Sequence, residues 1–154
     1  MSQVEDRLAA QGITLPQPVA PVANYVPFVR AGDLVHISGQ VSLDASGGIT
    51  GTVGVDVDMA TAVRAARLCG INLLAQMRAA CDGDLDRVKR VVKLGGFVQA
   101  GPDFYDIPAV INGCSDVMVE AFGDAGRHAR SAVGVYRLPR NFSVEVDAIV
   151  EIAR

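Results

Sequence analysis

Residues 130–152 have the sequence RSAVGVYRLPRNFSVEVDAIVEI. Two runs rich in β-formers, Arg130–Leu138 and Ser143–Ile152, flank Pro139-Arg140-Asn141, which predicts two strands joined by a turn. In the second run valine, alanine and isoleucine fill every other position from 144 to 152. This alternation predicts a strand with one buried face and one mixed face. The turn leaves the register of the two strands open, and a slip of one residue would exchange their faces.

Two long amphipathic helices are predicted beside these strands. The first covers residues 58–81 and ends before Gly83; the second begins at Asp106, has Pro108 in its first turn and closes at Gly123. Apolar residues recur in both at steps of three and four, which gives each helix one face for packing on a sheet. These residues are Val63, Ala66, Gly70, Leu73, Met77 and Ala80, then Ile107, Ile111, Cys114, Val117, Met118 and Phe122.

The rest of the chain adds a short helix and further strands. Ser2-Gln3-Val4-Glu5 forms a capping-box pattern, which predicts a helix over residues 3–11 followed by a proline-fixed arm, together residues 1–20. The remaining predicted elements are a hairpin of Tyr25–Arg30 and Leu34–Gln40, a short strand near Ile49 and a central strand over Val88–Gln99. The order predicts one α+β domain over residues 1–154, a mixed β-sheet with two long helices on one face.

The sheet face away from the helices is of mixed character. On the last strand this face carries Glu145, Asp147, Ile149 and Glu151. A face of this kind in a small domain is often covered by another copy of the chain, so we expect self-association.

Composition excludes several classes of protein. The chain has 154 residues, a net charge of −3 and dispersed lysines and arginines, so we expect no nucleic-acid partner. Its three cysteines, Cys69, Cys81 and Cys114, form no CxxC motif, so we expect neither a disulfide framework nor a metal site. Cys69 and Cys114 fall on apolar helical stripes, which predicts small buried side chains. The sequence contains no signal-peptide pattern and no apolar run long enough to span a bilayer. We therefore expect a cytoplasmic protein without a membrane partner.

Arg130 is the first candidate binding residue. It shares a strand face with Ala132 and Gly134, whose small side chains leave space beside it. The planar guanidinium suits bidentate capture of a carboxylate, although an arginine at the start of a strand is also a common solvated residue. Of the histidines, we expect His36 to pack within its strand and His128 to be solvated in a polar loop. Ser38 and Ser131 have no evident histidine partner, so a serine-hydrolase triad is not predicted.

These motifs together resemble those of the Rid family, also called YjgF-like, the reactive-intermediate enamine/imine deaminases. The resemblance runs from Ala20 onward and rests on four motifs in the family's order. These are the Tyr25 segment, Ser38-Gly39-Gln40, the helix from Ile111-Asn112 to Phe122, and the Arg-Ser strand, Leu-Pro turn and Val-Glu-Val-Asp-Ala strand at the end. It implies the chorismate-mutase-like fold, a homotrimer and clefts between its subunits.

The resemblance also assigns roles to individual residues. It implies that Arg130 clamps a substrate carboxylate, that Gly39 presents its backbone to the ligand and that Glu145 positions the attacking water. Tyr25 is then expected to line the pocket and Asn112 to lie near it. The chain departs from the family's pattern in three places. Ala-Asn-Tyr-Val-Pro replaces Gly-Pro-Tyr-Ser-Gln, Ala132 replaces a common cysteine, and the helix over residues 3–11 is an addition.

The implied activity is hydrolysis of a 2-imino or 2-enamino acid to a 2-keto acid and ammonia, with no cofactor. Without the resemblance, Glu145 would be a solvated strand residue, Tyr25 a core or interface residue and Gly39 a bulge. Two other functions remain open. One is a non-catalytic module that binds a small carboxylate metabolite such as a keto acid. The other is an endoribonuclease or translation inhibitor, against which the acidic charge balance argues.

Overall fold

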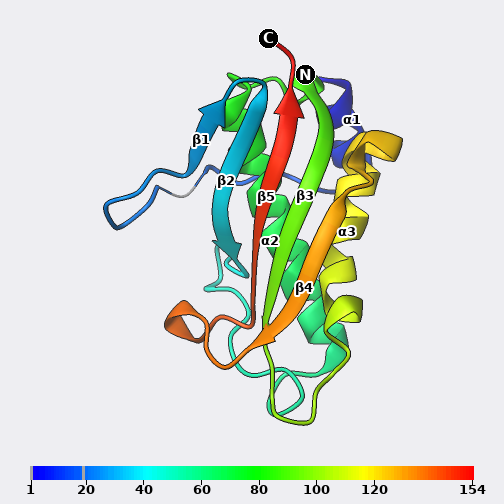
Figure 1. Cartoon of the computed structure of the whole chain (residues 1–154). Helices are drawn as coiled ribbons and strands as arrows, with labels where there is room; N and C mark the ends of the chain where they lie inside the picture. The colour runs from blue at the N-terminus through cyan, green and yellow to red at the C-terminus, as the bar shows by residue number, and fades with distance from the viewer. Residues whose placement is uncertain (1, 19) are drawn as a thin grey trace.

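The computed structural model describes residues 2–18 and 20–154, and its centre is a sheet of five strands. Across the sheet the order is β1-β2-β5-β3-β4, with β3 and β4 parallel and every other pair antiparallel. The strands are β1 (Phe28–Ala31), β2 (Leu34–Val41), β3 (Val88–Gln99), β4 (Ala129–Val135) and β5 (Val144–Ile152). Both long helices lie behind the sheet in Figure 1, which confirms the predicted α+β architecture.

The helices α2 (Met59–Ala80) and α3 (Ile107–Phe122) lie where the periodicity predicts them. Asp58 caps α2, since its carboxylate accepts the backbone N–H of Thr61 at 2.8 Å. Gly70 lets α2 approach α3, because a Cβ there would lie 3.2 Å from the Cys114 sulfur and overlap the Val117 side chain. The interface buries Cys69 and Cys114 completely, as predicted, and Cys81 is also fully buried.

The central strand β5 shows how sequence alternation becomes two faces. Val144, Val146, Ala148, Val150 and Ile152 are at most 2% exposed and pack under the helices. The residues between them are half-buried on the other face, which we call the open face. The predicted division of this strand is confirmed.

The predicted hairpin of the last two strands is wrong. β4 and β5 are not neighbours, because β3 lies between them and pairs with both. Arg130 is the partner of Leu94 in the β3–β4 register, and Glu145 is the partner of Phe97 in the β3–β5 register. β4 also ends at Val135, before the predicted Leu138. The alternation within each strand was readable, but it contains no information about which strand is adjacent.

The N-terminal helix begins where the capping motif predicts it. α1 (Gln3–Ala10) has the full Ser2–Glu5 capping box, and Asp86 of the short helix η1 (Leu85–Arg87) accepts the backbone N–H groups of Gln3 and Val4. Two expectations fail nearby. β1 begins at Phe28, so Tyr25 precedes the strand, and the region near Ile49 forms only an isolated bridge between Thr50 and Phe142.

Two short helices complete the chain, η2 (Gly123–Gly126) and η3 (Pro139–Asn141). Within residues 2–18 and 20–154, no helix has the length and apolarity to cross a membrane. The same residues contain no cluster of histidine, cysteine, aspartate or glutamate side chains suited to hold a metal ion.

Candidate functional site

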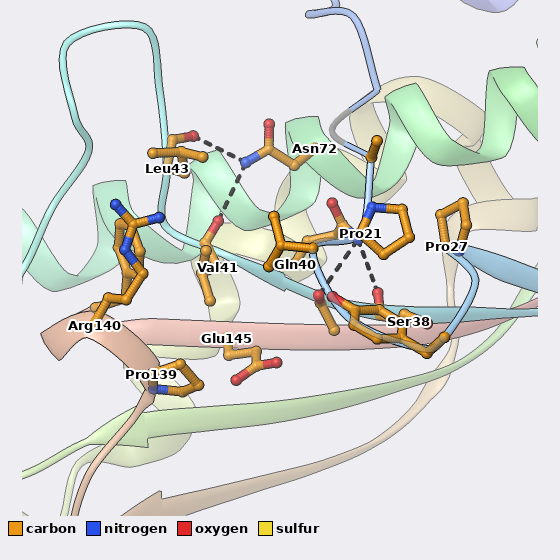
Figure 2. Close-up of a pocket in the computed structure, with 15 residues that line it drawn as sticks. Pro21, Pro27, Ser38, Gln40, Val41, Leu43, Asn72, Pro139, Arg140 and Glu145 are labelled. Atoms are coloured by element: carbon orange, nitrogen blue, oxygen red, sulfur yellow. Dashed lines mark hydrogen bonds between the residues drawn. The ribbon is translucent and has the colours of Figure 1, made fainter.

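A pocket of about 230 Å³ opens beside β2 and β5, on the side of the sheet that carries Glu145. Its wall includes two of the predicted site residues from distant parts of the chain, Tyr25 and Gly39, together with Glu145 itself. Pro27, Asn72, Arg140 and Phe142 complete much of the lining. In Figure 2 the Glu145 carboxylate lies between Pro139 and the Ser38–Gln40 segment. The structure therefore brings three of the five predicted residues together.

Glu145 and Gly39 are in direct contact across adjacent strands. A Cβ built on Gly39 would lie 3.1 Å from Cγ of Glu145 and would overlap its carboxylate. Gly39 is therefore required for the close approach of the Glu145 side chain to β2. Burial raises the pKa of Glu145, and the nearby Asp147 carboxylate raises it further. A carboxyl group with a raised pKa is suited to accept a proton near neutral pH.

The backbone around Gly39 is irregular and is held by side chains. The β2–β5 register shifts between Ile37 and Gln40, and the Gln40 amide donates to the Ser38 carbonyl at 3.0 Å. The Ser38 hydroxyl donates to the carbonyl of Val26 at 2.8 Å and so ties the Tyr25 segment to β2. Tyr25 itself is 54% exposed, which makes it an accessible wall of the pocket.

A strained turn forms the opposite wall. Arg140 and Asn141 have φ values of 54° and 64°, a left-handed conformation that costs roughly 1 kcal/mol or more for each residue. The buried Gln99 side chain holds this turn, because its amide donates to Asn141 Oδ1 at 2.7 Å and its carbonyl accepts the Leu138 N–H at 2.8 Å. No short motif in the sequence points to this role for Gln99.

The two remaining predicted residues, Arg130 and Asn112, lie elsewhere. Arg130 Nη1 donates to Asn112 Oδ1 at 2.8 Å and to Ser115 Oγ at 3.1 Å, and Nη2 donates to the Pro108 carbonyl at 3.2 Å. The guanidinium is therefore held along the first turns of α3. Its acceptors are the backbone carbonyl of Pro108 and the side chains of Asn112 and Ser115, which are three residues apart on one face of α3.

Sequence reasoning missed a histidine that belongs to this cluster. His128 is half-buried, with Nδ1 2.6 Å from the Gly126 carbonyl and Nε2 2.9 Å from Ser115 Oγ. Burial lowers the pKa of His128, and the charge of Arg130 lowers it further. The prediction that His128 is solvated is therefore wrong. The prediction that His36 packs within its strand is also wrong, because the side chain is exposed on the open face of β2.

The two groups of site residues cannot meet within one chain. Arg130 pairs with the fully buried Leu94 and therefore faces the helices, whereas Glu145 pairs with Phe97 on the open face. They are also separated across the sheet, since Arg130 is on the edge strand β4 and Gly39 is on β2. We call them the Arg130 half-site and the Glu145 half-site.

Cysteine chemistry is not a feature of either half-site. Burial raises the pKa of Cys114 to about 12, and it also raises the pKa values of Cys69 and Cys81. A thiol must ionise and be accessible to act as a nucleophile, so these three residues serve as packing groups.

Comparison with known families assigns the class of protein. Residues 5–152 match the model described as "YjgF/chorismate mutase-like, putative endoribonuclease". The chain belongs to this YjgF-like family, the Rid family expected from its motifs.

Individual relatives carry different names. The chain is 47% identical over 152 residues to protein TCP17 of Trypanosoma cruzi, covering 97% of this chain and 94% of that protein. It is 31% identical over 139 residues to a 2-iminobutanoate/2-iminopropanoate deaminase of Dermatophagoides farinae, covering 89% and 90% of the two chains.

Solved structures fall into two groups of similarity. A protein of unknown function from Agrobacterium tumefaciens has a TM-score of 0.92 at 50% identity, covering 97% of this chain and 92% of that chain. A "putative endoribonuclease" from Shewanella oneidensis has a TM-score of 0.93 at 32% identity, covering 97% and 99%. E. coli TdcF with bound serine has a TM-score of 0.63 at 26% identity, covering 89% and 94%. The backbone thus follows the first two proteins more closely than TdcF.

Proposed function

We propose that the protein hydrolyses 2-imino or 2-enamino acids to 2-keto acids and ammonia, in clefts that join the Arg130 half-site of one copy to the Glu145 half-site of the next. The observation that carries this proposal is the fixed guanidinium of Arg130, which still has free donors. A guanidinium has five N–H groups. Bonds to Asn112, Ser115 and Pro108 use three of them and leave Nε–H and one Nη2–H without an acceptor among the described residues.

These two free donors match the chemistry of a carboxylate. Nε and Nη2 lie along one edge of the guanidinium plane and can bind both oxygens of a carboxylate at once. The bonds to α3 hold the side chain in place before the ligand arrives, which reduces the entropy lost on binding. Arg130 would thereby fix the acid group common to all substrates of this class.

Glu145 supplies the second requirement of the reaction. An imine carbon is already electrophilic, so the site has to place a water molecule and move a proton. Glu145 accepts a proton as water adds to the C=N carbon and returns it to nitrogen. The resulting carbinolamine gives its hydroxyl proton to Glu145, which passes it to the nitrogen as the C–N bond breaks, and the products are the keto acid and ammonia. The raised pKa of Glu145 favours this exchange.

The proposed assembly follows from the positions of the two half-sites. They lie on opposite faces and toward opposite edges of the sheet, so a head-to-tail contact between copies would bring the Arg130 half-site of one copy against the Glu145 half-site of the next. Head-to-tail contacts that close form rings, and a homotrimer would contain three equivalent clefts. Light scattering at micromolar concentration should give the mass of three chains of 16.1 kDa each. A monomer would contradict the shared cleft.

Names of relatives support the same chemistry. One relative is named an imine deaminase, and TdcF is described with bound serine, a small molecule that carries a carboxylate. The substrates proposed here carry the same acid group, which Arg130 would bind.

The decisive assay generates 2-aminoacrylate and its imine in the cuvette and follows release of ammonia and keto acid. Wild-type protein should accelerate the release above the spontaneous rate, and Arg130→Ala should remove the acceleration. Activity that survives Arg130→Ala would contradict the proposed site.

A keto-acid binding module is the second candidate. Ala132 favours it, because this residue faces the same side as Arg130 and has no functional group where the family commonly has a cysteine. Protein that binds pyruvate through Arg130 but never accelerates ammonia release would be such a module. The endoribonuclease description receives less support, since the chain has a net charge of −3.

A further inference from the structure

We propose that Ser115 and His128 are positioning residues that hold Arg130 in its carboxylate-binding orientation and thereby set the affinity for substrate. This inference rests on the proposed function, because it concerns how Arg130 captures a carboxylate. It adds two residues that the family motifs did not indicate, one from α3 and one from the turn before β4.

The Gly126 carbonyl determines which group donates in each hydrogen bond of the cluster. The Gly126 carbonyl can only accept, so the proton of neutral His128 lies on Nδ1. Nε2 is then an acceptor, and the Ser115 hydroxyl donates to it. The lone pairs of Ser115 Oγ are left to accept from Arg130 Nη1. The chain of bonds therefore runs in one direction, from Arg130 through Ser115 and His128 to Gly126.

Both ends of this series of hydrogen bonds are attached to α3. Gly126 lies directly on the helix backbone, since a Cβ there would overlap the Met118 carbonyl and lie 2.9 Å from Cα of Val119. Its carbonyl is therefore a fixed acceptor for His128. At the other end, Arg130 also bonds to Asn112 and Pro108. The guanidinium plane is thus fixed by three acceptors, one of which depends on His128.

Removal of the Ser115 hydroxyl should have a specific effect. Nη1 would lose one of its two acceptors, while Nη2 would keep the Pro108 carbonyl. Arg130 would remain charged and present but would sample other orientations, and this freedom would have to be lost on binding. The cost should appear in carboxylate affinity and in KM. Turnover of bound substrate depends on Glu145 in the neighbouring copy and should change little.

The experiment compares pyruvate Kd by calorimetry with kcat and KM for the 2-aminoacrylate-derived imine, using the full chain. Ser115→Ala should raise Kd and KM about tenfold and leave kcat within about twofold. Ser115→Thr retains the hydroxyl and should restore both values. Ser46→Ala is the matched control, since it removes a hydroxyl from an exposed loop residue.

Two histidine variants separate positioning from simple packing. His128→Asn keeps a donor for the Gly126 carbonyl but is too short to accept from Ser115, so it should behave as Ser115→Ala does. His128→Gln places an amide oxygen near the position of Nε2 and should recover most of the affinity. Circular dichroism and light scattering on each variant confirm that fold and assembly are retained.

Arg130→Ala separates failure of this inference from failure of the proposed function. Loss of pyruvate binding in Arg130→Ala, with wild-type values in Ser115→Ala and His128→Asn, would overturn the positioning role alone. A fall in kcat at constant KM in those two variants would also overturn it. Pyruvate binding that survives Arg130→Ala would overturn both proposals.

Discussion

Arg130 and Glu145 lie on opposite faces of one sheet, on strands separated by β3. Each is nevertheless surrounded by the features expected of a binding site. Arg130 has a fixed guanidinium with two N–H groups that find no acceptor within residues 2–18 and 20–154, and Glu145 lines a pocket and has a raised pKa. The separation is therefore the main structural argument for a cleft that two copies share.

Arg130→Lys tests the need for a planar guanidinium. Lysine keeps the positive charge but has no fork to bind both carboxylate oxygens. Losing one charge-assisted bond costs roughly 1.5–3 kcal/mol, so kcat/KM should fall at least about tenfold. Arg64→Lys, at an exposed position on α2, is the control and should have wild-type kinetics. Equal kinetics for the two variants would show that Arg130 does not bind the substrate.

Glu145→Gln should raise the stability of the protein at pH 8 and lower its activity. Because the pKa of Glu145 is raised in the folded protein, the folded state binds its proton more tightly than the unfolded state does. That contribution to stability is present below the unfolded pKa and is lost as the pH rises through the folded pKa. The neutral glutamine avoids this loss, so Glu145→Gln should unfold at a higher temperature than wild type at pH 8.

The kinetic half of this prediction concerns the water molecule. Glu145→Gln should bind pyruvate as wild type does and should lower kcat about a hundredfold or more, since general base catalysis typically contributes roughly 10²–10⁴-fold. Urea or thermal unfolding at pH 8 and steady-state kinetics measure the two effects. A variant that is less stable at pH 8 and fully active would refute both roles.

Gly39→Ala should disable the Glu145 half-site without a strained backbone. The added Cβ would overlap the Glu145 carboxylate, which must then move. We expect kcat to fall about tenfold or more. Gly32→Ala is the contrasting control, because Gly32 has a φ of +64° and open space around it. That variant should lose about 1 kcal/mol of stability and keep its activity. The reverse pattern, with Gly39→Ala active, would show that the contact is only structural.

His128 should make stability depend on pH below neutrality. Its pKa in the folded protein is lowered, so the folded state favours neutral histidine. The contribution is therefore fully present above the unfolded pKa of about 6.5 and is lost as the pH falls from there through the folded pKa. Wild type should lose more stability than His128→Gln between pH 7.5 and pH 5, measured by urea unfolding. Parallel losses in the two proteins would contradict the lowered pKa.

Much of the fold could be predicted because its determinants are local. The Ser2–Glu5 box fixes the start of α1, and apolar spacing fixes α2 and α3 within one or two residues. The alternation in β5 correctly divides its faces. The position of β3 between β4 and β5 could not be predicted, because alternation is the same whichever strand is adjacent.

The site was predicted less completely, and for a physical reason. Family motifs named Tyr25, Gly39, Asn112, Arg130 and Glu145, and the structure separates them into two half-sites. Ser115, His128 and Gln99 act through hydrogen bonds between residues that are 13 to 42 positions apart. Such contacts are created by folding and leave no short motif. The i, i+3 spacing of Asn112 and Ser115 on one helix face was a usable sequence signal for part of this cluster.

The shared cleft is tested most directly by mixing two variants that are each strongly impaired. Arg130→Lys and Glu145→Gln chains, with different affinity tags, are co-expressed at equal levels and the mixed assemblies are purified. A cleft is intact when its Arg130 comes from a Glu145→Gln chain and its Glu145 from an Arg130→Lys chain. In a ring of three, each mixed assembly contains one such cleft, so about one third of the clefts are intact. Imine hydrolysis by the mixed assemblies at about one third of the wild-type rate is the predicted result. No activity beyond that of the separate variants would contradict a site built from two copies.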